Sequence, residues 1–237
     1  MPFIKTKFDS FKKFAVASLT DIYPEEKLKT AEKFAATELQ SMLLINDGKG
    51  HFTFQPLPRL AQISPGFTPV MSDLDADGNT DILLTQNYWS PQPETGRMNG
   101  GMGLLMLGDG KGGLRSVWPK ESGFYAWQDC KAMVESDFDG DGGPDFLLTI
   151  NDGPVEGYKM AATGKWQAVR LKADTTHPVV AGARLAAEMP DGRKLTAEVA
   201  AGSGYLSGGS GVVFFPKEAK NLTVRWPDGK SEPLAAK

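Results

Sequence analysis

The chain has little that could build a disulfide, a thiolate metal site or a membrane span. It contains one cysteine, Cys130, and two histidines, His51 and His177, among 237 residues. A lone cysteine excludes an internal disulfide and a zinc site built on thiolates, so we expect Cys130 to be a small buried residue. His51 is expected to be exposed or hydrogen-bonded on a strand. No apolar run approaches the roughly 18 residues of a membrane span, and we find no signal peptide.

The charge balance is also close to neutral, at −3. It gives no electrostatic reason to expect nucleic acid or an anionic membrane as a partner. Glycine, at 27 residues, and proline, at 16, are plentiful instead, and 41% of the chain is hydrophobic. This composition is typical of short strands joined by tight turns around a buried core, and it predicts a mainly β fold.

Two acid-rich stretches stand out, DLDADGNTDILL at Asp73–Leu84 and DFDGDGGPDFLL at Asp137–Leu148. Each has aspartates at its first, third, fifth and ninth positions, a glycine for a sharp turn, and then an aliphatic run of strand character. Hard oxygen ligands at this density suit Ca²⁺. An EF-hand is excluded because position twelve, a bidentate Glu in that motif, is leucine in both stretches, and a strand follows.

We therefore predict two structural Ca²⁺ sites, the first acid loop and the second acid loop, with the aspartates giving carboxylates and Asn79 and Gly143 giving backbone carbonyls. The first set is Asp73, Asp75, Asp77, Asn79 and Asp81, and the second is Asp137, Asp139, Asp141, Gly143 and Asp145.

Glycine-rich turns between apolar runs predict hairpins. SMLLINDGKGHFTFQ from Ser41 and GLLMLGDGKGGLRSVW at Gly103–Trp118 are the two clear copies. A third, weaker copy is expected at Gly157–Leu171, with its turn at Thr163 and Gly164. Strands follow these turns, so they are not phosphate loops, which need a helix N-terminus.

Upstream of the hairpins, Phe11–Leu19 is interpreted as a strand entering a degenerate acid loop, with Ser18 and Thr20 in place of carboxylates. The stretch Pro24–Gln40 is rich in helix formers with apolar residues on one face, and it predicts an inserted amphipathic helix.

Hairpins and acid loops together repeat with a period of about sixty residues. The best copy supplies four strands, at Phe67–Ser72, Thr80–Asn87, Gly103–Leu107 and Gly113–Trp118. Four-stranded units at this length are typical of β-propeller blades, which bury their faces against one another. The sequence predicts a partial propeller of about three blades.

These D-x-D-x-D-G-x-x-D loops and N-D-G-x-G-x-F hairpins resemble the FG-GAP/VCBS repeats of integrin alpha propellers and many secreted bacterial proteins. The resemblance implies Ca²⁺ on one rim of a propeller and an extracellular or cell-envelope location. Three blades cannot close a ring. Further blades from a longer chain or from a second copy are therefore expected as partners.

After Lys172 the chain changes to short strands at Lys194–Ala200, Gly211–Phe215 and Asn221–Arg225, which predict a small β-sandwich-like domain. Its G-A-R-L, G-S-G-Y-L-S-G and L-T-V-R-W-P-D-G-K segments resemble the ASPIC/UnbV domain of cartilage acidic proteins. We predict two domains, 1–172 with the blades and 173–237 with this β-domain.

The function predicted is that of a non-enzymatic calcium-binding repeat protein, a binding or adhesion module for an unknown protein or glycan. Two alternatives stay open: an enzyme acting on polysaccharide, with aspartates as acid and base, and a carbohydrate-binding surface using Tyr88, Trp89, Tyr125 and Trp127. The polar loop Asn87–Met102 is the expected partner surface, because function concentrates on loops of rigid scaffolds.

Overall fold

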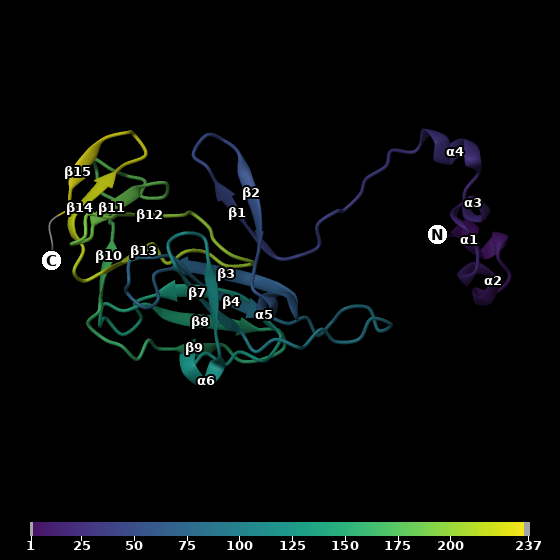
Figure 1. Ribbon diagram of the computed structural model, residues 1–237, viewed down its shortest axis with the longest axis horizontal. Helices are drawn as coiled ribbons and strands as arrows, with labels where there is room; N and C mark the ends of the chain where they lie inside the picture. The colour runs from purple at the N-terminus through teal and green to yellow at the C-terminus, as the bar shows by residue number, and fades with distance from the viewer. Residues whose placement is uncertain (1, 235–237) are drawn as a thin grey trace. The chain divides into compact units, whose positions relative to one another are not determined.

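The computed structural model describes residues 2–234. The chain divides into two compact units, Met1–Leu39 and Gln40–Lys237. The first unit holds four short helices, purple in Figure 1, none with a buried residue. They are α1 (Pro2–Lys7), α2 (Phe11–Ala15), α3 (Leu19–Ile22) and α4 (Glu25–Thr30).

The strand expected at Phe11–Leu19 is therefore wrong. Ser18 forms a capping box with Asp21, in which the Ser18 side chain accepts from the Asp21 backbone N–H and the Asp21 side chain accepts in return. Such reciprocal bonds start a helix. The helix expected over Pro24–Gln40 forms only as α4. Phe34 and Leu39, on its expected apolar face, are 86% and 88% exposed, so nothing packs on them to sustain a longer helix.

The second unit begins with the first predicted hairpin, β1 (Met42–Asn46) and β2 (Phe52–Pro56), which pair antiparallel and confirm that prediction. A short helix, α5 (Arg59–Gln62), follows. His51 is exposed and its Nδ1 lies 2.9 Å from Asp47 Oδ2, as expected, but the residue lies in the turn just before β2 and not on a strand.

The best predicted unit is a four-stranded antiparallel sheet, in the order β3-β4-β5-β6, as predicted (Figure 1). Its strands are β3 (Gly66–Ser72), β4 (Asp81–Gln86), β5 (Leu104–Gly108) and β6 (Leu114–Val117), and α6 (Pro119–Ser122) follows. All six residues of β4 are buried, because the strand has a neighbour on each side and apolar layers on its faces.

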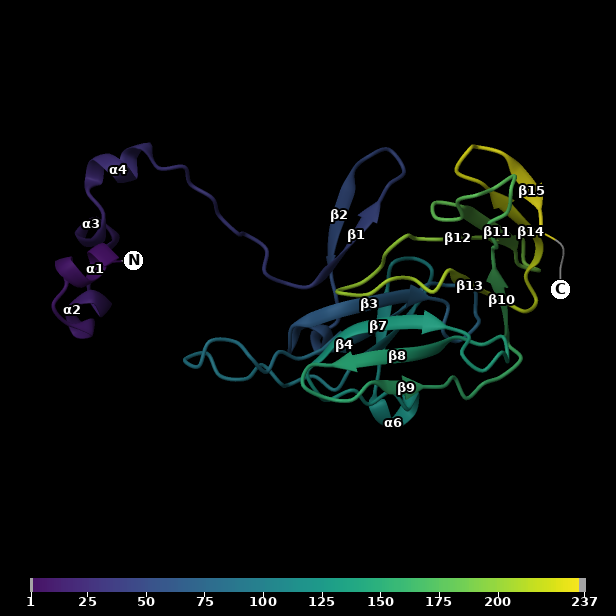
Figure 2. The same cartoon turned by 180° about the vertical axis from the view of Figure 1, so that it is seen from behind.

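A three-stranded sheet, β7-β8-β9, lies beside the first sheet, as Figures 1 and 2 both show. It consists of β7 (Cys130–Ser136), β8 (Asp145–Ile150) and β9 (Glu156–Tyr158). Leu83 of β4 and Leu148 of β8 belong to one buried cluster that joins the two sheets. Cys130 is fully buried in that cluster, as expected, and burial raises the pKa of its thiol to about 11.

The third hairpin, expected at Gly157–Leu171, is wrong. Its first strand, β9, pairs with β8, whereas β10 (Trp166–Arg170) pairs with β13 (Val212–Pro216) from the C-terminal region. Pairing with β13 sets Val169 opposite Val213 and packs it against the buried cluster that contains Phe215. It also lets the Gln167 side-chain amide donate to the backbone oxygens of Pro216 and Ala219. A hairpin with β9 would offer none of these contacts.

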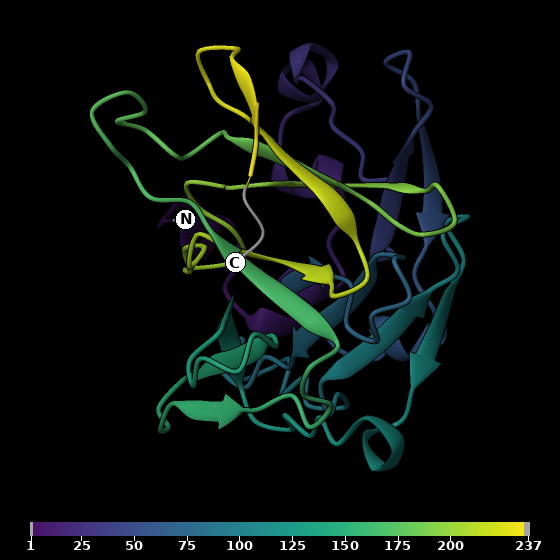
Figure 3. The same cartoon turned by 90° about the vertical axis from the view of Figure 1, so that its left-hand side faces the viewer.

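The C-terminal strands form a second small sheet, in the order β12-β11-β14-β15. Its strands are β11 (Arg184–Glu188), β12 (Lys194–Glu198), β14 (Lys220–Arg225) and β15 (Ser231–Pro233). Leu185 and Leu222 of this sheet share a buried cluster with Phe215 of the β10-β13 pair. Figure 3 shows these green and yellow strands gathered apart from the teal strands of the two preceding sheets.

The fold is therefore mainly β, with several small antiparallel sheets, none closed into a barrel within residues 2–234. Across that same range, no helix combines the length and the apolar character that crossing a bilayer requires.

Candidate metal centre

The ninth-position aspartate of each acid loop is buried at the first residue of a strand. Asp81 begins β4 and is fully buried. It accepts from the Leu74 N–H at 2.7 Å, within its own loop, and from the Gly108 N–H at 2.8 Å, on the neighbouring strand β5. Asp145, which begins β8, accepts in the same way from Phe138 and Met160, at 3.1 and 3.2 Å. The shared spacing thus gives a shared fold of the loop.

The first-position aspartates turn back onto the loop that follows them. Asp73 accepts from the N–H groups of Asp77 and Gly78, at 3.1 and 2.8 Å. In the second loop, Asp137 accepts from Gly140 and Gly142, at 2.8 and 3.2 Å. Gly78 and Gly142 both have positive φ, 83° and 86°, a conformation that glycine adopts without strain.

Each loop gathers three of its four carboxylates. One oxygen from each of three aspartates lies within 4.8 Å of the others, from positions one, three and nine in both loops. Three convergent carboxylates are a donor set that fits Ca²⁺. The two groups are Asp73, Asp75 and Asp81, and Asp137, Asp139 and Asp145.

The remaining predicted ligands lie outside these groups. The Asp77 carboxylate accepts from the backbone and side-chain amides of Asn79, at 2.7 and 2.8 Å. Asp141 accepts from the Gly143 N–H at 2.8 Å. The structure thus uses Asp77 and Asp141 to shape the turn, and their part in holding a metal stays a prediction.

In the first acid loop, carboxylates of like charge lie close together and are partly shielded from water. Desolvation, with smaller contributions from Asp77 and Asp81, raises the pKa of Asp73 to about 6. Desolvation likewise raises the pKa of Asp81 to about 6, and the neighbouring Asp75 and Asp77 add to it. Because a bound cation favours the ionised carboxylates, Ca²⁺ would relieve this repulsion directly.

A basic side chain contacts each acid loop, one from nearby in the sequence and the other from far along the chain. Lys159, just after β9, forms an ion pair with Asp139 and lies 3.4 Å from Asp141 Oδ2. The hydrogen bond from Lys159 lowers the pKa of Asp139. Arg193, in the turn between β11 and β12, donates to Asn79 Oδ1 at 2.9 Å and to the Asp77 backbone oxygen at 2.8 Å. The first acid loop is therefore in contact with the C-terminal β-domain.

A buried tryptophan makes a second contact of this kind. Trp166, at the start of β10, is 3% exposed, and its Nε1 donates to the Asp73 backbone oxygen at 2.8 Å. Its strand is the one that pairs with β13. The position of Asp73 thus depends on both the repeat unit and the C-terminal strands.

With this geometry established, the chain can be compared with known proteins. Residues 174–236 match the family model described as ASPIC and UnbV. The match confirms the resemblance found for the C-terminal region, and it includes Arg193 and strands β11 to β15. No curated protein matches the chain. The likeness of the acid-loop units to FG-GAP/VCBS repeats stays a prediction, as does the boundary between 172 and 173, because β10 precedes the ASPIC/UnbV region yet pairs with β13 within it.

Lys159, Trp166 and Arg193 were not foreseen as parts of the metal centre. Of the three, only Arg193 lies beside a sequence motif, the Pro-Asp-Gly turn that precedes it. That turn does not reveal which loop the Arg193 side chain contacts. Contacts between residues more than ninety positions apart depend on how the sheets pack.

The aromatic residues considered for sugar binding are divided by the fold. Trp89 and Trp127 lie 5.8 Å apart between ring centroids, with the Arg97 guanidinium 4.9 Å from the Trp89 ring. Tyr88 instead packs against Phe67, and Tyr125 is 51% exposed. The rings therefore do not form one continuous platform.

The loop Asn87–Met102 rests on a rigid base. The buried Asn87 side chain donates to the backbone oxygens of Gly101 and Trp127, at 2.9 and 2.7 Å, and accepts from Ser64 Oγ at 2.8 Å. Beyond Tyr88, which pairs with Met98, the loop is mostly exposed. It therefore presents polar surface on a fixed base.

The raised pKa values predict how the metal-free protein responds to pH. An acid whose pKa is higher folded than unfolded stabilises the fold below its unfolded value, near 4, and this contribution is lost as pH rises through the folded value. For Asp73 and Asp81 this stabilising contribution is lost between about pH 4 and pH 6, and the loss is complete above about pH 6. We expect the melting temperature in chelator to rise by roughly 3–8 °C from pH 7.5 to pH 5.

Differential scanning calorimetry across this pH range measures the effect, with Asp81→Asn as the comparison. The variant carries no charge at this position, so its melting temperature should rise less. Saturating Ca²⁺ should also flatten the dependence, because the bound ion holds the carboxylates ionised. Equal pH profiles for the chelated wild type and the variant would contradict the prediction.

The ion pairs of Lys159 predict how its removal changes the Ca²⁺ affinity of the second acid loop. Because its ammonium occupies Asp139 and Asp141, an incoming cation must displace it, so Lys159→Met should raise the Ca²⁺ affinity of the second loop by roughly two- to fivefold. Isothermal titration calorimetry measures this. Lys165→Met, at an exposed lysine outside the loop, is the matched control. Weaker binding by the Lys159 variant would show that the lysine supports the site.

Proposed function

We propose that this chain is a non-enzymatic, calcium-stabilised binding module. In this proposal its propeller-type repeats bind two structural Ca²⁺ ions, and its ASPIC/UnbV region contacts and stabilises the loop that binds the first ion. The observation that supports it most is the repeated geometry, with three carboxylates within 4.8 Å in each of two loops that share their backbone hydrogen bonds. Calcium would supply the positive charge that the buried aspartates need.

The same geometry argues against an enzyme that uses these aspartates. Asp73, Asp81, Asp137 and Asp145 already accept two backbone N–H groups each, which fixes them as loop-forming acceptors. Neither histidine joins them: His51 lies on the β1-β2 hairpin, and the His177 ring stacks on Trp226 at 4.0 Å. The proposed location is extracellular or in the cell envelope, where free calcium is high enough to fill such sites.

The partner surface proposed for propeller completion is the open edge of β1. The β1-β2 hairpin matches β5-β6: Asn46 pairs with Phe52 as Gly108 pairs with Leu114. In both turns an aspartate, Asp47 or Asp109, accepts from the N–H groups two and four residues further on.

The two hairpins differ on one side. β5 has β4 along its other edge, whereas β1 pairs only with β2 within residues 2–234. The consequence is visible in exposure, because Met106 of β5 is fully buried and Leu44, its counterpart in β1, is 55% exposed. We propose that the missing neighbour is a strand of the β4 type, from another repeat or from a second copy. Strand edges of this kind favour pairing.

Calcium dependence is tested by melting the full chain in excess Ca²⁺ and in chelator. At about 100 times the dissociation constant, each ion would stabilise the fold by about 2.7 kcal/mol, so we expect a clear rise in melting temperature with Ca²⁺. Replacing Asp73 and Asp137 by Asn should abolish most of that rise. Asp228→Asn, in an exposed turn that contacts neither loop, is the matched control. Identical midpoints with and without Ca²⁺ would overturn the proposal.

Strand pairing is tested by sedimentation velocity. Wild type should associate as its concentration rises, and Leu44→Lys should reduce this by placing charge on the open edge. Val155→Lys, at a similarly exposed site outside the hairpin, should associate as the wild type does. A wild type that stays monomeric at about 100 μM would contradict association through β1.

A further inference from the structure

A cavity separates the repeat sheets from the C-terminal strands, away from the carboxylate groups described above. It has a volume of about 320 Å³ and is bounded by β3 and β7 on one side, and by β12, β13 and the loop between them on the other. A second cavity, of about 590 Å³, adjoins it and extends to Asp73 of the first acid loop. The two cavities share the lining residues Met71, Glu135, Glu198, Val212 and Val213. The volumes of both cavities are within the range of small-molecule sites.

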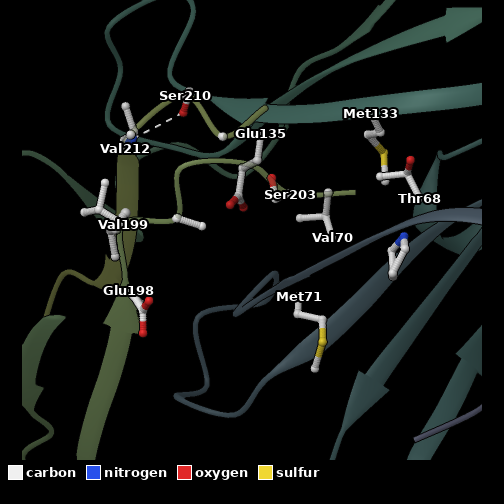
Figure 4. Close-up of a pocket in the computed structure, with 15 residues that line it drawn as sticks. Thr68, Val70, Met71, Met133, Glu135, Glu198, Val199, Ser203, Ser210 and Val212 are labelled. Atoms are coloured by element: carbon white, nitrogen blue, oxygen red, sulfur yellow. Dashed lines mark hydrogen bonds between the residues drawn. The ribbon is translucent and has the colours of Figure 1, made fainter. Parts of the chain in front are cut away.

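Glu135 of β7 points its carboxylate into this space, as Figure 4 shows. Burial raises the pKa of this carboxyl to about 7. The residue is half-buried, yet its Oε1 is shielded from solvent and has no hydrogen-bond partner among the described residues. Leaving a buried acceptor unpaired is unfavourable, and more so when it is charged. The cavity therefore presents an acceptor that requires a donor.

No lysine, arginine or histidine is among the residues that line the 320 Å³ cavity. Arg193 and Lys194 line the adjoining cavity, and the Arg193 guanidinium already donates to Asp191, Asn79 and Asp77. The other acid, Glu198, is already paired with Arg184, whose Nε lies 3.1 Å from Glu198 Oε2. Thr68, Ser203 and Ser210 contribute hydroxyl groups. A cavity with acidic and hydroxyl groups and no basic ones disfavours anions and selects a cation with N–H donors.

The remaining wall is apolar, from Val70, Val199 and Val212. A bare metal ion would gain nothing from these side chains, and it would find only one unpaired carboxylate where each acid loop offers three. An aliphatic stem suits the wall, and an ammonium group suits Glu135.

We propose that this cavity binds a small organic ammonium ion, with the ammonium on Glu135 and its aliphatic part against the three valines. The site does not require the acid loops to hold calcium. It is a ligand site in addition to the binding-module function proposed above.

The test uses the full chain with n-butylammonium as the probe, titrated by NMR at constant Ca²⁺. At about pH 8 the amine is protonated. We expect saturable shifts at cavity residues, with a dissociation constant of about 1 mM or tighter. Neutral n-butanol and anionic butyrate test the charge requirement, and both should bind at least about tenfold more weakly, since hydrogen bonds to charged groups are the strong ones.

Glu135→Gln keeps the side-chain shape and should weaken n-butylammonium binding at least about tenfold, while Glu188→Gln, outside the cavity, should leave it unchanged. Ser203→Phe, on an exposed loop, should block the space without removing the acid. Far-UV circular dichroism checks that each variant is folded. Equal binding of butanol, full binding by Glu135→Gln, or no saturation up to about 50 mM would each overturn the proposal.

Discussion

The structure depends on burying a carboxylate at the first residue of a strand. Asp81 and Asp145 each accept from an N–H within their own loop and from another on the next segment of the sheet. An isolated buried charge is unstable, and two backbone donors offset only part of the cost. The other two carboxylates in each group add repulsion. A cation bound there would complete a geometry that the backbone already fixes, and it would stabilise the loop, the strand and its neighbour together.

The first loop extends this dependence to the C-terminal region. Trp166 donates to the Asp73 backbone, and Arg193 donates to Asn79 and to Asp77. Among residues 2–234, the base that forms an ion pair with the second loop is Lys159, which is close in sequence. An ion bound at the first loop would therefore be coupled to the packing of β10 and the β11-β12 turn, whereas an ion bound at the second would be coupled to local structure. Two loops of nearly the same sequence thus have different roles.

Local sequence patterns predicted the features that local chemistry decides. The β1-β2 and β5-β6 hairpins follow from Asp-Gly-Lys-Gly turns between apolar runs, and the four-stranded sheet follows from an acid loop and a hairpin repeating in one unit. The strand predicted at Phe11–Leu19 is wrong because the Ser18 capping box, not the apolar run, decides that segment. The third predicted hairpin is wrong because β13, more than forty residues away, offers β10 a better partner than β9 does. The same reason hid Trp166 and Arg193, since no local pattern specifies which sheets pack together.

Comparison of the two repeat units explains why Glu135 is unusual. Met71 of β3 and Glu135 of β7 occupy matching positions, two residues before the aspartate that opens each acid loop, and each pairs with the second residue of the following strand. Both side chains line the cavities against the C-terminal strands. Methionine serves there as an ordinary apolar wall, so the position itself does not call for an acid. The Glu135 Oε1 lacks a hydrogen-bond partner at a position where the other unit has a methionine, and this contrast supports the ammonium site proposed for the cavity.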